Sequence, residues 1–118
     1  MQNRLANWPA PKNISALTTT RLFGYSAAPF DSNNLAFHVG DVDLQVSKNR
    51  QQLTELLCLP AEPIWLNQTH STICISAETE SNRNADASVT RSKNCPLVVM
   101  TADCLPITLC NTQGTEIA

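Results

Sequence analysis

Two short stretches of the sequence carry side chains that could bind a transition metal. Residues 67–70 read Asn-Gln-Thr-His and supply the imidazole of His70, and residues 101–106 read Thr-Ala-Asp-Cys-Leu-Pro and supply the thiol of Cys104. Imidazole and thiolate are donors that zinc readily accepts in proteins. A catalytic zinc site typically takes three protein ligands and keeps one position open for water or substrate. The two stretches therefore predict most of a metal site, with His70 and Cys104 as metal ligands.

Polar side chains beside both expected ligands could orient them. Gln68 lies two positions before His70, and Asp103 directly precedes Cys104. Hydrogen-bonding partners of metal ligands commonly fix the geometry of the ligands, so we assign Gln68 and Asp103 to the expected catalytic centre. A zinc-bound thiol is deprotonated outright, and Cys104 is therefore expected to act as a ligand rather than as a nucleophile.

The segments on either side of the two stretches read as strands that would hold the ligands rigidly. The run Leu97–Met100 is continuous and apolar, which favours a strand buried on both faces. Residues 72–76 alternate, with Ile73 and Ile75 on one face and Cys74 on the other. Further strands are expected at residues 64–66 and 105–110, and a hairpin loop at 111–114 leads to a returning strand at 115–118.

The first part of the chain is expected to be less regular. Residues 1–13 read as an extended N-terminal arm, and residues 14–21, with three threonines, suit a strand. Residues 24–37 are rich in Ser, Asn and Pro and predict a long loop that covers or forms a functional site.

The most regular element is a helix that follows this loop. Asp41 or Asp43 is expected to cap it, because a side-chain oxygen there can accept hydrogen bonds from free N–H groups of the first turn. Apolar residues between positions 46 and 57 recur at roughly helical spacing. Pro60 and Pro63 are expected to end the helix, since proline lacks the N–H group that a helix needs.

Composition narrows the class of protein. The chain has 118 residues, 42% of them apolar, so we expect at most one domain with a modest core. The formal net charge is −2 and no Lys/Arg cluster exists, which argues against a nucleic-acid partner. The N-terminus lacks the apolar run of a signal peptide, and no apolar run is long enough to cross a membrane. Five cysteines without paired spacing predict reduced thiols and a cytoplasmic location.

Several other residues of chemical interest have plain structural interpretations. Four cysteines, at positions 58, 74, 95 and 110, are expected to be small buried hydrophobic residues. His38 is expected to support the loop near the site or, less simply, to contact substrate. Asp86 lies between two alanines and could either hold a turn or face the pocket. The residue pattern leaves both alternatives for Asp86 open.

An ordered series of motifs resembles a known family. The motifs are Thr19-Thr20-Arg21 with Gly24 and Ser26, Asn34-Leu35, residues 38–41, Asn49-Arg50, residues 65–70, Ala85-Asp86-Ala87 with Thr90, residues 101–106, Gly114 and Ile117-Ala118. Over roughly residues 18–118 they resemble the N-terminal half of the laccase-domain family. Its members are called multicopper polyphenol oxidase-like proteins and are now largely described as purine nucleoside phosphorylases. Two departures are Phe23, where the family usually has glycine, and Thr69, where it often has valine.

The resemblance implies a fold and a metal. The expected fold class is α+β, with mixed β-sheets packed between helical layers in a cytotoxic-necrotising-factor-like architecture that is incomplete at its C-terminal end. Residues 14–118 would be the N-terminal part of the domain, and residues 1–13 its arm. The family's zinc ligands would be His70, Cys104 and a later histidine in an His-Ala-Gly-Trp-Arg-Gly motif beyond Ala118.

The resemblance also implies an activity. It predicts a zinc-dependent purine nucleoside phosphorylase with adenosine deaminase activity, in which Arg21, Ser26 and His38 bind phosphate or nucleoside. A copper-dependent polyphenol oxidoreductase is an alternative, although no Cys-His cluster typical of copper sites is present. A truncated, catalytically incomplete fragment is a third possibility. A homo-oligomer could form if the edge of the strand at residues 115–118 pairs with another chain.

Overall fold

The structure, a computed structural model, describes residues 1–118 and mixes short strands with one α-helix, as expected. The elements in chain order are β1 (Asn3–Leu5), β2 (Leu17–Thr19), the 3-10 helix η1 (Phe37–Val39), α1 (Asp43–Leu56), β3 (Cys74–Ser76) and β4 (Ala87–Val89). The chain divides into two compact units, one made of residues 1–7 and 16–59 and the other of residues 8–15 and 60–118. The α-helix is neither long nor apolar enough to span a membrane.

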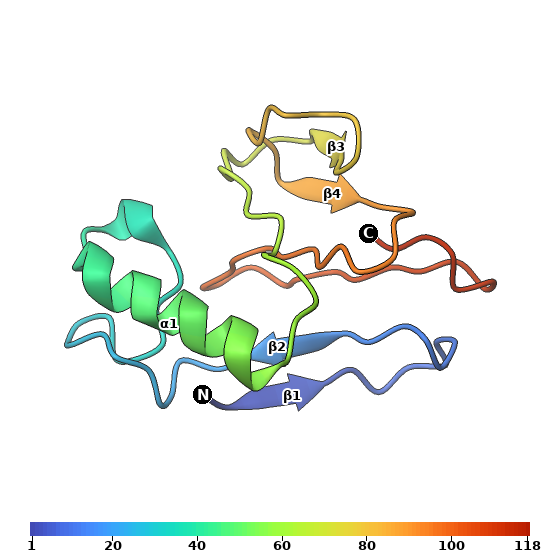
Figure 1. Ribbon diagram of the computed structural model, residues 1–118. Coiled ribbons are helices and arrows are strands. Elements are labelled where there is room, and N and C mark those ends of the chain that lie inside the picture. Colours follow the sequence, from blue (N-terminus) through green and yellow to red (C-terminus); the bar gives the residue numbers. More distant parts are fainter. The chain divides into compact units, whose positions relative to one another are not determined.

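The first unit contains a two-stranded antiparallel sheet. Strands β1 and β2 lie side by side (Figure 1), and Asn3 pairs with Thr19 while Leu5 pairs with Leu17. The strand expected at residues 14–21 is thus present over Leu17–Thr19. Residues 3–5, within the expected arm, form its partner strand.

Helix α1 packs through one face. Its buried residues are Val46, Asn49 and Leu53, whose spacing of three and four positions places them on one side of a helix. The expected cap was wrong: the N-cap is Val42, which offers no side-chain acceptor. Asp41 instead accepts a hydrogen bond from the Val42 N–H at 2.7 Å, and Asp43 lies inside the first turn.

The helix ends through its own backbone. The N–H of Leu59 donates to the carbonyl of Thr54 at 3.0 Å, and the N–H of Cys58 donates to the carbonyl of Glu55 at 3.1 Å. Together these form the Schellman arrangement, whose C′ residue adopts left-handed backbone angles. Cys58 is that residue, with φ of 48°. The left-handed turn therefore closes the helix before Pro60 is reached.

The second unit is built around a small core. Leu66, Ile75 and Ala85 are buried together, and the partly buried Ile64 and Val99 pack against them. Strand β3 pairs in parallel with β4, and Cys74 lies opposite Ala87 (Figure 1). The alternation expected at residues 72–76 buries Ile75 only, because Ile73 is half exposed.

Two of the expected strands of the second unit are weaker than their sequences suggest. Residues 97–100 are half-buried, and only Leu97 forms a bridge, in parallel with Ile64. Residues 105–110 carry an exposed apolar ridge of Leu105, Ile107 and Leu109, with exposed fractions of 84%, 70% and 60%. No strand runs beside residues 105–108, so their side chains stay outside the core.

The expected hairpin is present at residues 109–118. Cys110 bridges Ile117, and Leu109 and Ala118 exchange backbone hydrogen bonds of 2.8 and 2.9 Å. Gly114 has a φ of 68°, a conformation that glycine adopts without strain. Ile117 also bridges Thr90 on its other side, so the returning strand is flanked on both sides.

The expected burial of the cysteines was wrong. All five are free thiols; Cys58 and Cys74 are exposed, and Cys95 and Cys110 are only partly buried. Cys58 lies in the turn that ends α1, outside its packed face. Cys74 is on β3 next to the buried Ile75, and neighbouring residues of a strand point to opposite faces.

Candidate functional site

Asp86 organises the turn that carries His70. Its Oδ1 accepts hydrogen bonds from the N–H groups of Thr69 and Ser71, both at 2.9 Å, and from the Ser71 hydroxyl at 3.0 Å. Its Oδ2 accepts the N–H of His70 at 3.2 Å. Of the two roles left open for Asp86, the structure therefore shows the turn-holding one.

These hydrogen bonds also keep the carboxylate charged. The N–H of Ser71, followed by that of Thr69, lowers the pKa of Asp86 below its usual value. His70 itself is exposed and has a φ of 56°, in the left-handed region that residues with a side chain seldom occupy. The turn thus presents the imidazole to solvent on a backbone that an ionised carboxylate holds.

Gln68 links the two predicted metal-binding stretches. Its Nε2 donates to the carbonyl of Met100 at 2.8 Å, and its Oε1 accepts the N–H of Met100 at 2.7 Å. Met100 directly precedes residues 101–106, the stretch that carries Cys104. Because both polar ends of the amide are used, Gln68 acts as a clamp that fixes one stretch beside the start of the other.

The second stretch is exposed at its chemically interesting residues. Asp103 and Cys104 both lie on the surface, and the side chain of Asp103 makes no hydrogen bond or ion pair within the chain. Cys104 is a free thiol. Both side chains are therefore accessible to an ion or a substrate.

His70 and Cys104 are donor types that zinc accepts, but two protein ligands are fewer than the three of a typical catalytic zinc site. The chain contains no group of three or more His, Cys, Asp and Glu side chains that could hold a metal ion. An imidazole nitrogen and a thiolate sulfur are borderline and soft donors, which zinc accepts. His70 and Cys104 can thus provide part of a zinc coordination sphere, and further donors are needed to complete it.

In the first unit, Arg21 already has a partner. Its Nε donates to the carbonyl of Asp31 at 2.7 Å, and its Nη2 forms an ion pair with Asp31 Oδ2 at 3.1 Å. The side chain nevertheless stays 68% exposed. The rest of the guanidinium therefore remains accessible to solvent.

The backbone of the loop around Arg21 shows why glycine suits the position that Phe23 occupies. Phe23 has a φ of 64°, the conformation that glycine would adopt most easily. Its neighbour Gly24 lies so close to the next pass of the loop that a Cβ atom would be 2.2 Å from the Ser32 carbonyl oxygen. The loop keeps a glycine-like backbone at Phe23.

Ser26 is part of a buried polar network. Its hydroxyl donates to Asp41 Oδ2 at 2.6 Å and accepts from Asn49 Nδ2 at 3.0 Å. The Ser26 hydroxyl and then the Asn34 amide lower the pKa of Asp41. Ser26 thus uses its hydroxyl within the chain, where it supports the loop that carries Arg21.

Asn49 is the centre of this network, and sequence reasoning gave it no role. It is fully buried, its Oδ1 accepts the N–H of Tyr25 at 2.7 Å, and its Nδ2 donates to the carbonyl of Asn34 at 2.8 Å. The available signal was an asparagine on the apolar face of a predicted helix, since a buried amide must find hydrogen-bonding partners.

His38 lies in η1 and is exposed. The guanidinium of Arg50 stacks 4.5 Å from the ring of its neighbour Phe37, and Arg50 Nε donates to the carbonyl of Leu35 at 2.8 Å. These contacts fix the short helix on α1 and leave the imidazole of His38 free to contact a ligand.

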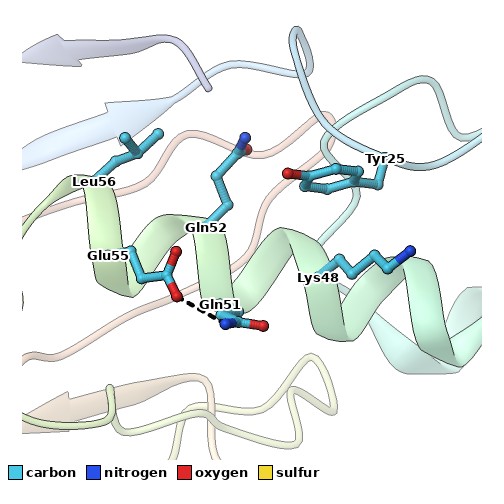
Figure 2. A pocket seen from close by; sticks show the side chains of 6 residues that line it. All are labelled: Tyr25, Lys48, Gln51, Gln52, Glu55 and Leu56. Atoms are coloured by element: carbon cyan, nitrogen blue, oxygen red, sulfur yellow. Dashed lines mark hydrogen bonds between the residues drawn. The ribbon is translucent and has the colours of Figure 1, made fainter.

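A groove runs along α1, separate from every predicted site residue. It is lined by Tyr25, Lys48, Gln51, Gln52, Glu55 and Leu56. Figure 2 shows the ring of Tyr25 reaching over the helix beside Gln52 and Lys48, with a hydrogen bond between Gln51 and Glu55. The Lys48 ammonium lies 5.8 Å from the Tyr25 ring centre.

The predicted site residues thus fall into two groups. Gln68, His70, Asp103 and Cys104 belong to the second unit, where the clamp at Met100 joins their two stretches. Arg21, Ser26 and His38 belong to the first unit.

Comparison with known sequences assigns relatives to the chain. The profile of the family described as multi-copper polyphenol oxidoreductase laccase matches residues 15–118. A purine nucleoside phosphorylase of Haemophilus influenzae is 50% identical over 119 residues, which cover 100% of this chain and 49% of that protein. The purine nucleoside phosphorylase YfiH of Escherichia coli is 42% identical over 113 residues, which cover 94% of this chain and 46% of that protein.

Solved structures agree with the sequence comparison. The protein NMB0706 of Neisseria meningitidis superimposes with a TM-score of 0.90 at 39% identity, over 99% of this chain and 48% of that one. The hypothetical protein YfiH of Bacillus licheniformis superimposes with a TM-score of 0.79 at 25% identity, over 87% of this chain and 43% of that one. The chain spans about half the length of the relatives it matches.

Proposed function

Because this chain belongs to the multi-copper polyphenol oxidoreductase laccase family, we propose that it serves a zinc-dependent purine nucleoside phosphorylase that also deaminates adenosine. Its substrates would be a purine nucleoside and phosphate. The observation that carries the proposal is the 50% identity to a protein named purine nucleoside phosphorylase over the whole of this chain. Two features support it: the exposed His70 and Cys104, and the Gln68 clamp between their stretches.

The proposed reaction assigns a part to each group. In phosphorolysis a phosphate oxygen bonds to the anomeric carbon, the glycosidic C–N bond breaks, and the departing purine takes up a proton. Arg21 would bind the phosphate through its exposed guanidinium edge. Asp103 would transfer the proton that the departing purine takes up. In deamination, water adds to the purine C6 and ammonia leaves. Ser26 would support the loop that carries Arg21, and His38 would contact the nucleoside.

Zinc is part of the proposal. His70 and Cys104 would hold it together with further donors, and when bound it would polarise an oxygen and acidify a bound water. Gln68 would fix the spacing of the two stretches by its hydrogen bonds to Met100.

The proposal extends to the architecture and the location. We assign residues 14–118 to the N-terminal part of a cytotoxic-necrotising-factor-like domain with mixed sheets between helical layers, and residues 1–13 to an N-terminal arm that adds strand β1 to its first sheet. The TM-score of 0.90 with the Neisseria protein supports a shared fold. We place the protein in the cytoplasm, without a nucleic-acid or membrane partner.

A second candidate, copper-dependent oxidation of phenols, is favoured by the description of the matching family. A third reading, a catalytically incomplete fragment, is favoured by the absence of a group of three metal-binding side chains. The three candidates differ in the metal that the chain binds and in the product it forms.

The deciding experiment starts with metal analysis by mass spectrometry on the chain purified without added metal or chelator. The same sample is then incubated with adenosine or inosine, with and without phosphate. We expect zinc in the preparation and phosphate-dependent release of the purine base. Copper together with oxidation of a phenol would favour the second candidate. A chain that takes up no metal and releases no base would be an incomplete fragment.

Variants separate a specific metal site from adventitious thiol binding. Cys104→Ser and His70→Ala should lose the bound zinc. Cys74→Ser is the matched control, because Cys74 is also an exposed free thiol of the second unit. Equal zinc loss in Cys74→Ser and Cys104→Ser would contradict the assignment of Cys104.

We also propose that the protein forms a homo-oligomer through the extended segment at residues 105–108, next to its C-terminal hairpin. The free edge expected for the strand at residues 115–118 was wrong, because Ile117 bridges Thr90 on one side and Cys110 on the other. Residues 105–108 directly precede the hairpin, and none of their backbone groups makes a hydrogen bond within the described chain. An unpaired extended segment with apolar side chains favours pairing with another chain.

A further inference from the structure

We propose that Asp86 is a positioning residue that holds His70 in the backbone conformation from which its imidazole binds metal. This inference rests on the proposed zinc function and adds a residue to which that function assigns no role. The Asp86 carboxylate accepts the N–H groups of Thr69, His70 and Ser71 at 2.9, 3.2 and 2.9 Å. Successive N–H groups that converge in this way form an anion-binding concavity.

The conformation of His70 makes this support necessary. Its φ of 56° is unfavourable for a residue with a Cβ atom. Such a conformation persists only where the surrounding structure determines it. Loss of the carboxylate would remove the shared acceptor of three consecutive N–H groups and let the turn relax. Because Gln68 is fixed on Met100, a relaxed turn would change the position of His70 relative to its own anchored neighbour.

Both oxygens of Asp86 take part, so an amide cannot replace the carboxylate. Oδ1 serves Thr69 and Ser71, and Oδ2 serves His70. In Asp86→Asn, one acceptor becomes an NH₂ group that faces an N–H donor. The substitution therefore keeps the size of the side chain while opposing the turn.

Glu78→Gln is the matched control. Glu78 also belongs to the second unit, and its Oε1 accepts the N–H groups of Arg91 and Ser92, both at 3.1 Å. It closes a loop in the same manner as Asp86, and its contacts do not include residues 69–71. General weakening of the unit should therefore affect both variants, whereas an effect on His70 should appear in Asp86→Asn alone.

The first measurement is zinc affinity, by competition with a chelator, on the full chain and both variants. Hydrogen-bonding partners of metal ligands typically contribute about 10- to 100-fold to metal affinity, and we expect a loss of this size in Asp86→Asn and none in Glu78→Gln. Cobalt replacing zinc should show a thiolate absorption band that weakens in Asp86→Asn. Unchanged affinity in Asp86→Asn, or an equal loss in both variants, would overturn the positioning role.

The second measurement does not need metal. Backbone NMR coupling constants of the metal-free chain report the φ angle of His70, and the resonances of Ile75 report whether the core is folded. We expect His70 to leave the left-handed region in Asp86→Asn and to keep it in Glu78→Gln. A left-handed His70 in Asp86→Asn would overturn the inference. A chain that binds no zinc, yet whose His70 depends on Asp86, would overturn the zinc function and support the holding role of Asp86.

Discussion

Asn49 shows how much a single residue can contribute to the loop that carries Arg21. Its amide joins Tyr25, Ser26 and Asn34 through hydrogen bonds of 2.7 to 3.0 Å and is fully buried. In Asn49→Ala the N–H of Tyr25 and the carbonyl of Asn34 lose their partners, and each buried unsatisfied group costs about 1–3 kcal/mol.

We therefore expect Asn49→Ala to lower the free energy of unfolding by about 3 kcal/mol, as the sum of such terms. Urea unfolding followed by circular dichroism of α1 measures this change. Gln51→Ala serves as control, because Gln51 is exposed on the same helix and such surface changes are usually within about 0.5 kcal/mol. Equal effects of the two substitutions would refute a special role for the buried amide.

Cys58 offers a substitution that should stabilise the protein. It occupies the left-handed C′ position of α1, where glycine is the usual residue. The left-handed conformation costs a residue with a Cβ about 1–2 kcal/mol, and glycine adds about 0.5–1 kcal/mol of chain entropy loss on folding. Cys58→Gly should therefore raise the free energy of unfolding by about 0.75 kcal/mol, the difference between the middles of these two ranges. Cys58→Ala, which keeps the strain and removes the thiol, should not raise it.

At the scale of elements, the two hydrogen bonds of Gln68 to Met100 should keep the segment that starts at Met100 well ordered. Gln68→Glu keeps the acceptor for the Met100 N–H and replaces the donor by an oxygen facing the Met100 carbonyl. We expect the free energy of unfolding to fall by about 1 kcal/mol, the usual net contribution of one hydrogen bond, and we expect faster amide hydrogen exchange at Met100. Gln113→Glu, in the exposed hairpin turn, is the control and should leave that exchange rate unchanged.

The carboxylate of Glu78 ties the loop between β3 and β4 to residues 90–92, directly after β4. The stability of this connection should depend on pH. The Thr90 hydroxyl, followed by the Ser92 N–H, lowers the pKa of Glu78 from 4.5 to about 2. A carboxyl whose pKa is lowered by folding stabilises the fold fully above its unfolded pKa. The contribution of Glu78 should thus be complete above pH 4.5 and be lost as the pH falls through about 2.

NMR of the Arg91 and Ser92 amides during an acid titration checks this window. Their resonances should move with the protonation of Glu78 near pH 2. In Glu78→Gln the transition should disappear, while resonances of residues 69–71 should still follow Asp86, whose pKa is also lowered. A transition of the Ser92 amide near pH 4.5 would mean that Glu78 is not held as the structure shows.

Local patterns predicted the elements that local interactions build. Helix α1 follows from apolar spacing, and the hairpin at residues 111–114 follows from its turn residues and Gly114. The two ends of helix α1 were harder to predict. No side chain caps the helix at Val42, and the left-handed backbone at Cys58 ends it before Pro60.

The candidate site was predictable only in its residue types. His70 and Cys104 stand out as donors, but Asp86 reaches the 69–71 turn across a loop and a strand, and no local pattern encodes such a contact. Asn49 is similar, since its partners lie in a loop far earlier in the chain. Exposure was also hard to infer: residues 105–110 read as a strand, yet burial of a strand requires a neighbouring segment that composition does not reveal.

At the scale of the whole molecule, the exposed ridge of Leu105, Ile107 and Leu109 raises the question of association. Contiguous exposed apolar side chains on an unpaired extended segment commonly mark an interface. No charged residue occurs within residues 105–110 to oppose edge-to-edge pairing. Pro106 lacks an N–H group, so within residues 105–108 the backbone donors available to a partner strand are Leu105, Ile107 and Thr108.

Light scattering coupled to size-exclusion chromatography tests this association directly. The unmodified chain should form a dimer or larger species that dissociates on dilution, and Ile107→Lys should be monomeric because a charge in the centre of the ridge would be buried without a partner. Leu44→Lys is the matched control: Leu44 is 61% exposed, on α1, and lies outside the ridge. A monomer at every concentration would refute the homo-oligomer, and dissociation by both substitutions would place the contact elsewhere. Zinc binding measured on the same fractions then shows whether the missing donors come from a second chain, because Ile107→Lys should in that case lose the metal along with the partner.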